Sequence, residues 1–322
     1  MLLRLADPDE RYVAVRLSSD LPPYDFAREN GEWRLELDAP VDRLEYQLEV
    51  QDEDGDTEYI LDPDNPRTAP GAFGDKSVAL RPGYAPPAWL EQPQVEGQLI
   101  SLTSPGRGLR VDIDLWSPAD ADPQERLPLL VAHDGPEYDR LGQLTRYAAA
   151  QIAANELPPH RLALLAPRER NEWYSASPRY TRALVGQVLP ALPPSDRPPA
   201  AMGASLGALA LLHAQARHPH AFGALFLQSG SFFMPRYDAH ESNFPYYHRV
   251  VGFVSEIQRT GYRSQVPITL TCGEAEENIH NNRAMAETLE APLHEVLDTH
   301  NYVAWRDALD PQLIDLLARA WG

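Results

Sequence analysis

Cysteine is almost absent from this chain, and long apolar runs are absent altogether. The single cysteine, Cys272, excludes an internal disulfide bond and a cysteine-based zinc site. No apolar stretch approaches the roughly 18 residues that a membrane-spanning helix needs. Residues 1–7 also lack the basic head, apolar centre and cleavage site of a secretory signal. We therefore expect a soluble cytoplasmic protein that does not bind membranes.

Lysine is equally scarce, and Lys76 is the only one. The 28 basic side chains face 47 acidic ones, which gives a formal net charge of −19. Such a surface repels phosphate backbones and anionic lipid, so it argues against binding of nucleic acid or membrane. An anionic substrate would have to be met by a local cluster of arginines that works against the overall field.

The N-terminal part of the 322-residue chain alternates short apolar and polar segments and shows no helical period. Strands are expected at 11–17, 32–37, 44–50 and 57–61, between turn signals such as Asn30-Gly31 and Asp54-Gly55. The pattern predicts a small β-sandwich. The proline-rich stretch 81–87 has no periodicity and is the expected boundary, so the first domain is placed at residues 1–92.

The pattern changes from about residue 95 onward. Nearly continuous apolar runs, typical of strands buried on both faces, occur at 127–132, 161–166, 200–202, 224–228 and 266–272. Amphipathic stretches expected to be helices lie at 138–155, 176–190, 206–217, 244–259, 277–290 and 303–320. Strands that alternate with helices predict an α/β domain over residues 93–322 with a mostly parallel sheet. Its chemistry should collect at the carboxyl ends of the strands.

The sharpest motif is Gly203-Ala204-Ser205-Leu206-Gly207, between a short strand and a helix. We call this turn the elbow. Glycines in this pattern permit a tight turn that strains the serine backbone and lifts its hydroxyl above the sheet edge. The following N–H groups belong to a helix N-terminus, where negative charge is favoured. We interpret Ser205 as a nucleophile rather than a serine in an ordinary turn.

A serine nucleophile needs a base, and in this fold the base follows the acid in the chain. Ten histidines are present. Those just after the elbow, at 213, 218 and 220, favour surface or helix-end roles, and His280 lies in a polar helical stretch. His300 follows the last expected strand, Pro292–Leu297, and so should lie at the carboxyl edge of the sheet. It is the predicted base, and an ordinary loop histidine is the alternative.

The acid must orient the imidazole and stabilise its protonated form. Three glutamates, Glu274, Glu276 and Glu277, follow the strand that ends near Cys272. Spacing alone does not choose among them, because acidic residues also favour the first turn of the next helix.

The oxyanion of an acyl-transfer reaction needs two backbone N–H donors. Leu206, directly after the nucleophile, should supply one. The other should come from the turn His133-Asp134-Gly135-Pro136, where Pro136 has no N–H to offer.

Several of these segments together resemble the enterochelin (enterobactin) esterase family, α/β hydrolases of the esterase D group. The resemblance lies in the elbow, the 133–135 turn, Gln228-Ser229-Gly230-Ser231-Phe232, Arg170–Tyr174 and His300–Arg306. Leu44-Glu45-Tyr46, Asp54-Gly55 and Asp62–Pro66 resemble the early-set, immunoglobulin-like domain that precedes the hydrolase in this family. The resemblance implies an α/β-hydrolase fold and hydrolysis of the ester bonds of a catecholate siderophore, often as its ferric complex.

The resemblance also implies roles for particular residues: Ser205 as nucleophile, His300 as base and Glu276 as acid. Two positions depart from the family pattern. Asp298-Thr299 stand where the family often has two glycines before the histidine, and Pro136 stands where related enzymes have an oxyanion donor. Gly135 or Glu137 must then supply that N–H group.

A ferric tricatecholate is a bulky aromatic trianion, so its site should offer arginine and aromatic surface. Arg168, Arg170, Trp173 and Tyr174 follow the strand 161–166 and are the expected substrate contacts. The alternative is that Arg170 and Glu172 form a structural ion pair and the aromatic rings pack the loop.

We therefore expect a serine esterase that works through an acyl-enzyme on a small-molecule ester and needs no cofactor or metal. The nearest rival is an esterase of the same fold for carbohydrate, feruloyl or small acyl esters. A rival of another class is a hydrolase-fold protein that binds a siderophore or glycan without turnover.

Overall fold

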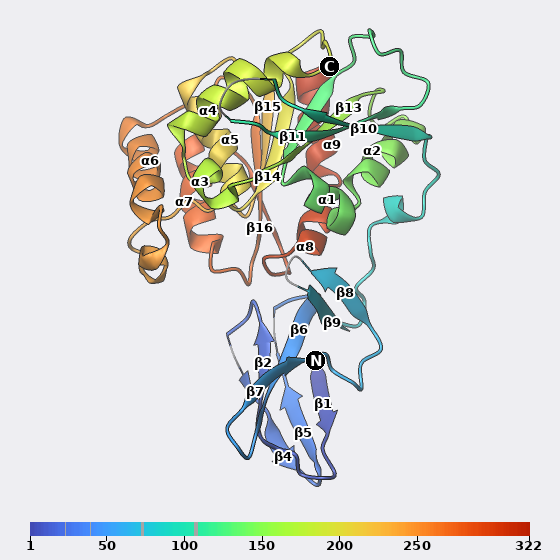
Figure 1. The fold of residues 1–322 in the computed structure, drawn as a ribbon, viewed down its shortest axis with the longest axis vertical. Coiled ribbons are helices and arrows are strands. Elements are labelled where there is room, and N and C mark those ends of the chain that lie inside the picture. The colour runs from blue at the N-terminus through green and yellow to red at the C-terminus, as the bar shows by residue number, and fades with distance from the viewer. Residues whose placement is uncertain (23, 39, 72–73, 106–108) are drawn as a thin grey trace. The chain divides into compact units, whose positions relative to one another are not determined.

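The computed structural model describes residues 1–22, 24–38, 40–71, 74–105 and 109–322. These residues form two compact units (Figure 1). The first consists of Met1–Ala85 together with Gly273–Glu276 and Val296–Ala304. The second consists of Pro86–Cys272, Glu277–Glu295 and Trp305–Gly322.

The first unit is built on antiparallel sheets. Its strands are β1 (Leu2–Ala6), β2 (Tyr12–Ser19), β3 (Tyr24–Asp25), β4 (Ala27–Glu29), β5 (Glu32–Glu36), β6 (Arg43–Asp52), β7 (Thr57–Ile60), β8 (Thr68–Gly71) and β9 (Gly74–Leu80). One sheet has the order β1-β5-β4 and the other the order β3-β2-β6-β9-β8, with β7 also paired to β6. The four strands predicted from the sequence correspond to β2, β5, β6 and β7.

Alternating side chains of these strands form one apolar core. In β1, for example, Leu3 and Leu5 are buried while their neighbours are exposed. They join Trp33, Leu44 and Tyr46 in the same cluster. Period-two burial is what a sheet with one covered face requires.

The second unit is a mixed sheet with helices. Its strands are β10 (Gly97–Thr103), β11 (Asp112–Pro118), β12 (Leu129–His133), β13 (Arg161–Ala166), β14 (Ala200–Ala204), β15 (Ala224–Gln228), β16 (Ile268–Gly273) and β17 (Leu293–Val296). The sheet order is β10-β11-β13-β12-β14-β15-β16-β17. The pairs from β13 through β12, β14 and β15 to β16 are parallel, so the carboxyl ends of these strands meet at one edge.

The helices are α1 (Gly135–Gly142), α2 (Leu144–Ala153), α3 (Arg170–Tyr174), α4 (Pro178–Ala183), α5 (Leu206–Arg217), α6 (Tyr247–Thr260), α7 (Ile279–Leu289), α8 (Tyr302–Asp307) and α9 (Gln312–Trp321). Short helical turns are η1 (Ala88–Leu90), η2 (Leu184–Val188), η3 (Leu189–Ala191) and η4 (Ala239–Asn243). No helix within the described ranges is long and apolar enough to cross a membrane.

Two predicted helices are interrupted. The stretch 138–155 divides at Gln143, whose φ of 54° ends α1 and begins α2. The stretch 303–320 divides before Pro311, which directly precedes α9 and has no N–H with which to continue a helix. In α9, Leu313, Leu316, Leu317 and Trp321 are buried at helical spacing.

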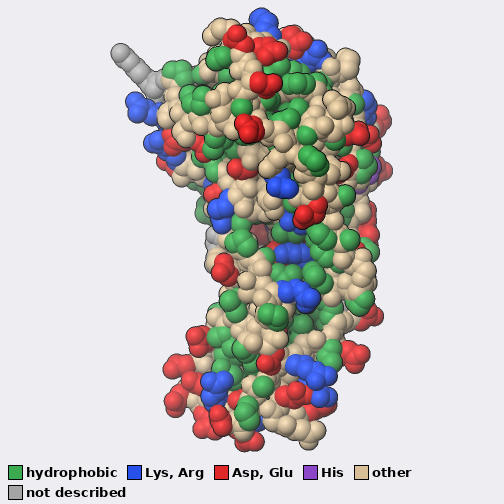
Figure 2. All heavy atoms as spheres, turned by 90° about the vertical axis from the view of Figure 1, so that its right-hand side faces the viewer, with side chains coloured by type: hydrophobic (Ala, Val, Ile, Leu, Met, Phe, Trp, Pro, Cys, Tyr) green, Lys and Arg blue, Asp and Glu red, His purple; other side chains and the backbone are tan. Residues whose placement is uncertain are grey.

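The architecture confirms an α/β fold preceded by an all-β antiparallel region. Helix α5 lies in the interior, because every residue from Leu206 to Gln215 is buried. On the surface, acidic, basic and hydrophobic side chains are interspersed over the face that Figure 2 shows.

Candidate active site

Ser205 occupies a strained junction between β14 and α5. Its backbone has φ 56° and ψ −126°, a conformation that residues other than glycine rarely adopt. The junction is held from β15 and the loop after it. The Ser205 N–H donates to the Gln228 carbonyl at 2.9 Å, and the Ser231 N–H donates to the Ser205 carbonyl at 3.1 Å. These backbone hydrogen bonds offset the strain and hold the half-buried Ser205 at the strand end.

The glycines of the motif are required by close packing. A Cβ atom on Gly203 would lie 2.9 Å from the Gly207 carbonyl carbon, closer than real Cβ contacts. A Cβ atom on Gly207 would lie 3.2 Å from the Cβ of His133. The tight turn that the sequence predicted is therefore present, and larger residues at 203 would force it open.

The turn after β12 lies against the start of α5. The His133 Nδ1 atom is 3.0 Å from the Gly207 carbonyl oxygen. Gly135 begins α1, and a Cβ atom there would lie 2.2 Å from Leu164 Cα. Pro136 stands in the first turn of α1, where a missing N–H leaves no intrahelical bond unmade. The end of β12 thus packs against the start of α5 through His133 and Gly207.

Glu276 and His300 form a hydrogen-bonded pair in the first unit. His300 Nδ1 lies 2.7 Å from Glu276 Oε2, and the Gly273 N–H donates to Glu276 Oε1 at 2.8 Å. The Glu276 side chain is only 1% exposed, whereas that of His300 is 32% exposed. When Nδ1 carries the proton shared with the carboxylate, Nε2 is the basic nitrogen of the ring. The pair has the geometry of an oriented general base.

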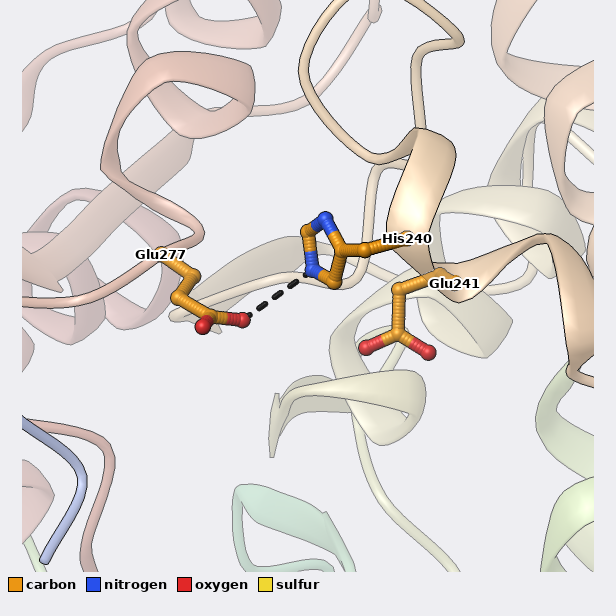
Figure 3. Close-up of side chains that lie close together, drawn as sticks. All are labelled: His240, Glu241 and Glu277. Carbon is orange, nitrogen blue, oxygen red and sulfur yellow. Dashed lines mark hydrogen bonds and ion pairs between the residues drawn. The ribbon is translucent and has the colours of Figure 1, made fainter. Parts of the chain in front are cut away.

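The other two glutamates have different surroundings. Glu274 is exposed. Glu277 accepts from His240 Nε2 at 3.1 Å (Figure 3). Together with Glu241, these two side chains place possible metal-ligating atoms within 4.8 Å of one another. His240 and Glu277 are 52% and 75% exposed, and the hydrogen bond between them accounts for their approach.

The segment that carries His300 is shaped by its own side chains. Asp298 Oδ1 accepts from the Thr299 N–H at 2.7 Å and from Asn301 Nδ2 at 3.0 Å. The Asp42 N–H donates to the Leu297 carbonyl at 2.8 Å, within the same unit. Asp298 and Thr299 therefore build by side-chain bonding the turn for which two glycines are common in the resembled family.

Trp173 and Tyr174, expected as substrate contacts, are instead buried. They are 4% and 0% exposed and belong to the core of the second unit. Tyr174 stacks on His133 with ring centroids 4.4 Å apart, and the Tyr180 hydroxyl donates to His133 Nε2 at 2.9 Å. Burial lowers the pKa of His133 to about 4, so this imidazole stays neutral and serves packing. The rings take the loop-packing role that the sequence left as the alternative.

Arg168 and Arg170 both pair with carboxylates. Arg168 makes two bonds of 3.0 Å to the half-exposed Asp112. Arg170 Nη2 lies 2.8 Å from Oδ2 of Asp134, whose side chain is only 5% exposed. Arg170 thus ties α3 to the turn after β12, while Arg168 stays 55% exposed beside its partner.

Ser231 is a neighbour of Ser205 that sequence reasoning did not assign. Its hydroxyl oxygen lies 3.1 Å from that of Ser205. The available signal was its place in the Gln228–Phe232 run, directly after the strand beside β14.

The mixed sheet with a strained serine between a parallel strand and a buried helix is the framework of an α/β hydrolase. The chain belongs to the esterase family, because residues 104–316 match the family model described as "Putative esterase". It is a carboxylic ester hydrolase.

Similar proteins include the iron(III) enterobactin esterase of Escherichia coli O6:H1. It is 26% identical over 285 residues, which cover 80% of this chain and 67% of that protein. The ferric enterobactin esterase of Salmonella typhimurium has a similar structure, with a TM-score of 0.77 and 20% identity over 98% of this chain and 93% of that one. The structure of the enterobactin esterase of Shigella flexneri, solved in the presence of enterobactin, is also similar. Its TM-score is 0.75 and its sequence identity 21%, over 98% of this chain and 92% of that one. These similarities establish the fold.

Proposed function

We propose that this chain hydrolyses the ester bonds of a catecholate siderophore of the enterobactin trilactone type, including its ferric complex. The observation that carries the proposal is the strained Ser205 backbone at the carboxyl end of β14. The similarity to an iron(III) enterobactin esterase over 80% of the chain supports the substrate class. In this proposal, catalysis belongs to an α/β-hydrolase domain over residues 93–322, preceded by an early-set, immunoglobulin-like domain over residues 1–92.

Ser205, His300 and Glu276 act as nucleophile, base and acid in the proposed mechanism. Ser205 Oγ attacks the ester carbonyl carbon while His300 Nε2 takes the Ser205 proton. Glu276 accepts a hydrogen bond from the Nδ1–H group of His300 and stabilises the imidazolium that forms. Support comes from the 2.7 Å contact between Glu276 and His300, and from the place of His300 after β17, a strand of the same sheet as β14.

The tetrahedral intermediate places negative charge on the former carbonyl oxygen. The Leu206 N–H and the Gly135 N–H, each at the start of a helix, are the proposed donors to it. Contacts between His133 and Gly207 support their convergence, because His133 precedes Gly135 by two residues and Gly207 directly follows Leu206.

Collapse of the intermediate breaks the bond to the leaving alcohol, which receives the proton held by His300. Water then attacks the acyl-enzyme carbonyl and gives a proton to His300. The second collapse returns that proton to Ser205 and releases the carboxylic acid. Each step is balanced by proton transfers through one imidazole.

Arginine is the proposed partner for an anionic substrate. Arg168 is the better placed of the two predicted arginines, because it is 55% exposed and its carboxylate partner is exposed as well. Arg170 is proposed to act in support, through its bond to the buried Asp134.

A hydrolysis panel with product analysis by mass spectrometry tests the proposal. It compares ferric and iron-free enterobactin-type trilactones with feruloyl and acetyl sugar esters. We expect the trilactones to have the highest kcat/KM, and Ser205→Ala and His300→Ala each to lower it by about 10⁴-fold or more. Preference for feruloyl or sugar esters would contradict the substrate class. Retention of trilactone without turnover would identify a binding protein instead.

A further inference from the structure

Ser231 places a second hydroxyl against the nucleophile. Its Oγ lies 3.1 Å from Ser205 Oγ, and its side chain is almost completely buried at 4% exposure. The Ser231 N–H also donates to the Ser205 carbonyl at 3.1 Å. A buried hydroxyl costs free energy unless it is hydrogen-bonded, and this one makes its bond to the atom proposed to react.

The loop that presents Ser231 is fixed from α7. Asn282 is fully buried and binds Gly230 at two points. Its Nδ2 donates to the Gly230 carbonyl at 2.9 Å, and its Oδ1 accepts from the Gly230 N–H at 3.0 Å. Because one planar amide satisfies both groups of one peptide residue, the backbone directly before Ser231 has little freedom to rotate.

Two further bonds hold the residue before Gly230. The Trp305 indole N–H donates to Ser229 Oγ at 2.9 Å, and Asn278 Nδ2 donates to the Ser229 carbonyl at 3.2 Å. Ser229 has φ 46°, a left-handed conformation that such bonding sustains. These hydrogen bonds therefore fix the loop and hold the Ser231 hydroxyl beside Ser205 Oγ.

We propose that Ser231 is a further catalytic residue, whose hydroxyl donates a hydrogen bond to Ser205 Oγ. Asn282 is its positioning residue. The inference rests on the proposed role of Ser205 as nucleophile. Ser231 keeps its own proton throughout, so no bond to it forms or breaks.

The direction of the bond follows from the proposed mechanism. The Ser205 proton goes to His300, so a lone pair of Ser205 Oγ accepts from Ser231. The bond holds Oγ in one rotamer before attack. When the acyl-enzyme breaks down, Oγ is the leaving group and gains negative charge, and hydrogen bonds to charged oxygen are the stronger ones. The benefit should therefore appear in kcat rather than in KM.

Ser231→Ala tests the donor directly. We expect kcat to fall by about 10- to 100-fold with KM nearly unchanged, the range that one hydrogen bond to a developing charge supplies. The rate at which a fluorophosphonate probe labels Ser205 should fall by a similar factor. Ser231→Cys, which keeps the shape but offers a weak donor, should give an intermediate loss and provides a second variant if Ser231→Ala folds poorly.

Ser104→Ala is the matched control. Ser104 is also buried, at 3% exposure, and its hydroxyl accepts from the Val111 N–H at 3.0 Å. This variant should lower Tm by an amount similar to Ser231→Ala, while its kcat and labelling rate stay at the wild-type values. The comparison separates loss of a buried hydroxyl from loss of this particular one.

Asn282→Asp tests the positioning role. It keeps the side-chain size and the acceptor but removes the donor to the Gly230 carbonyl. We expect kcat to fall in the wild-type background and to change little in the Ser231→Ala background, because the amide acts through Ser231. Equal losses in both backgrounds would contradict a role through Ser231.

Probe labelling of Ser231→Ala and of the wild-type protein distinguishes a wrong role for Ser231 from a wrong role for Ser205. Wild-type kcat and labelling rate in Ser231→Ala, with the probe on Ser205, would overturn this inference and leave the proposed function intact. A wild-type probe adduct on Ser231 instead of Ser205 would overturn both.

Discussion

At the scale of single residues, the site depends on how one carboxylate is aimed. The sequence marks both proposed residues locally, Ser205 by the glycines of a tight turn and His300 by its place after a strand. The glutamate that meets His300 could not be chosen by spacing. The choice is made by the turn Gly273–Glu276, in which a backbone N–H holds one oxygen of Glu276 and leaves the other for His300.

The three glutamates offer a direct comparison. Glu276→Gln should lower kcat by roughly 10²- to 10⁴-fold, because the amide cannot stabilise the imidazolium and favours the wrong tautomer. Glu274→Gln should have little effect because its side chain is exposed. Glu277→Gln should also leave kcat nearly unchanged, because it removes only the exposed contact with His240. Steady-state rates of the three variants provide the test, and equally small losses in all three would indicate a Ser–His dyad.

At the scale of elements, the buried parallel strands and most helices could be predicted because their apolar runs and periods are strong. The edge strand β10 could not. Almost every residue of β10 is exposed, so this edge strand carries no alternation that sequence analysis could detect. The pairing of Arg170 with Asp134 was also hidden, because 36 residues separate the two in the chain.

Arg170→Ala should destabilise the protein, because it leaves the buried Asp134 carboxylate without its guanidinium partner. We expect the free energy of unfolding to fall by about 1–3 kcal/mol. Arg168→Ala, which breaks an exposed pair, should lower the free energy of unfolding by less than Arg170→Ala does. Urea unfolding curves of both variants measure this. Unchanged stability in Arg170→Ala with a raised KM for the trilactone would make Arg170 a substrate contact after all.

At the scale of the whole molecule, the net charge of −19 makes the protein acidic. Charged side chains are distributed over the face in Figure 2. Such a field opposes an anionic substrate, so local cations must capture it. Interior histidines add a second electrostatic property. Burial lowers the pKa of His133, His160 and His213 to about 4.

These histidines predict loss of stability in acid. Their pKa is about 6.5 in the unfolded chain, which therefore binds more protons than the folded protein as the pH falls. The free energy of unfolding should be highest above about pH 6.5 and should decrease toward pH 4, by up to about 1.4 kcal/mol per pH unit for each histidine. Urea unfolding at about pH 7 and about pH 5 measures the difference, and His160→Gln should reduce it. Equal stability of the wild-type protein at both pH values would contradict the prediction.

The central claim is that Ser205 is the nucleophile of this esterase. Labelling with a fluorophosphonate probe, followed by peptide mapping by mass spectrometry, tests it most directly. We predict one adduct on Ser205 and none in Ser205→Ala. Absence of labelling in the folded wild-type protein, or an adduct on another residue, would contradict the account.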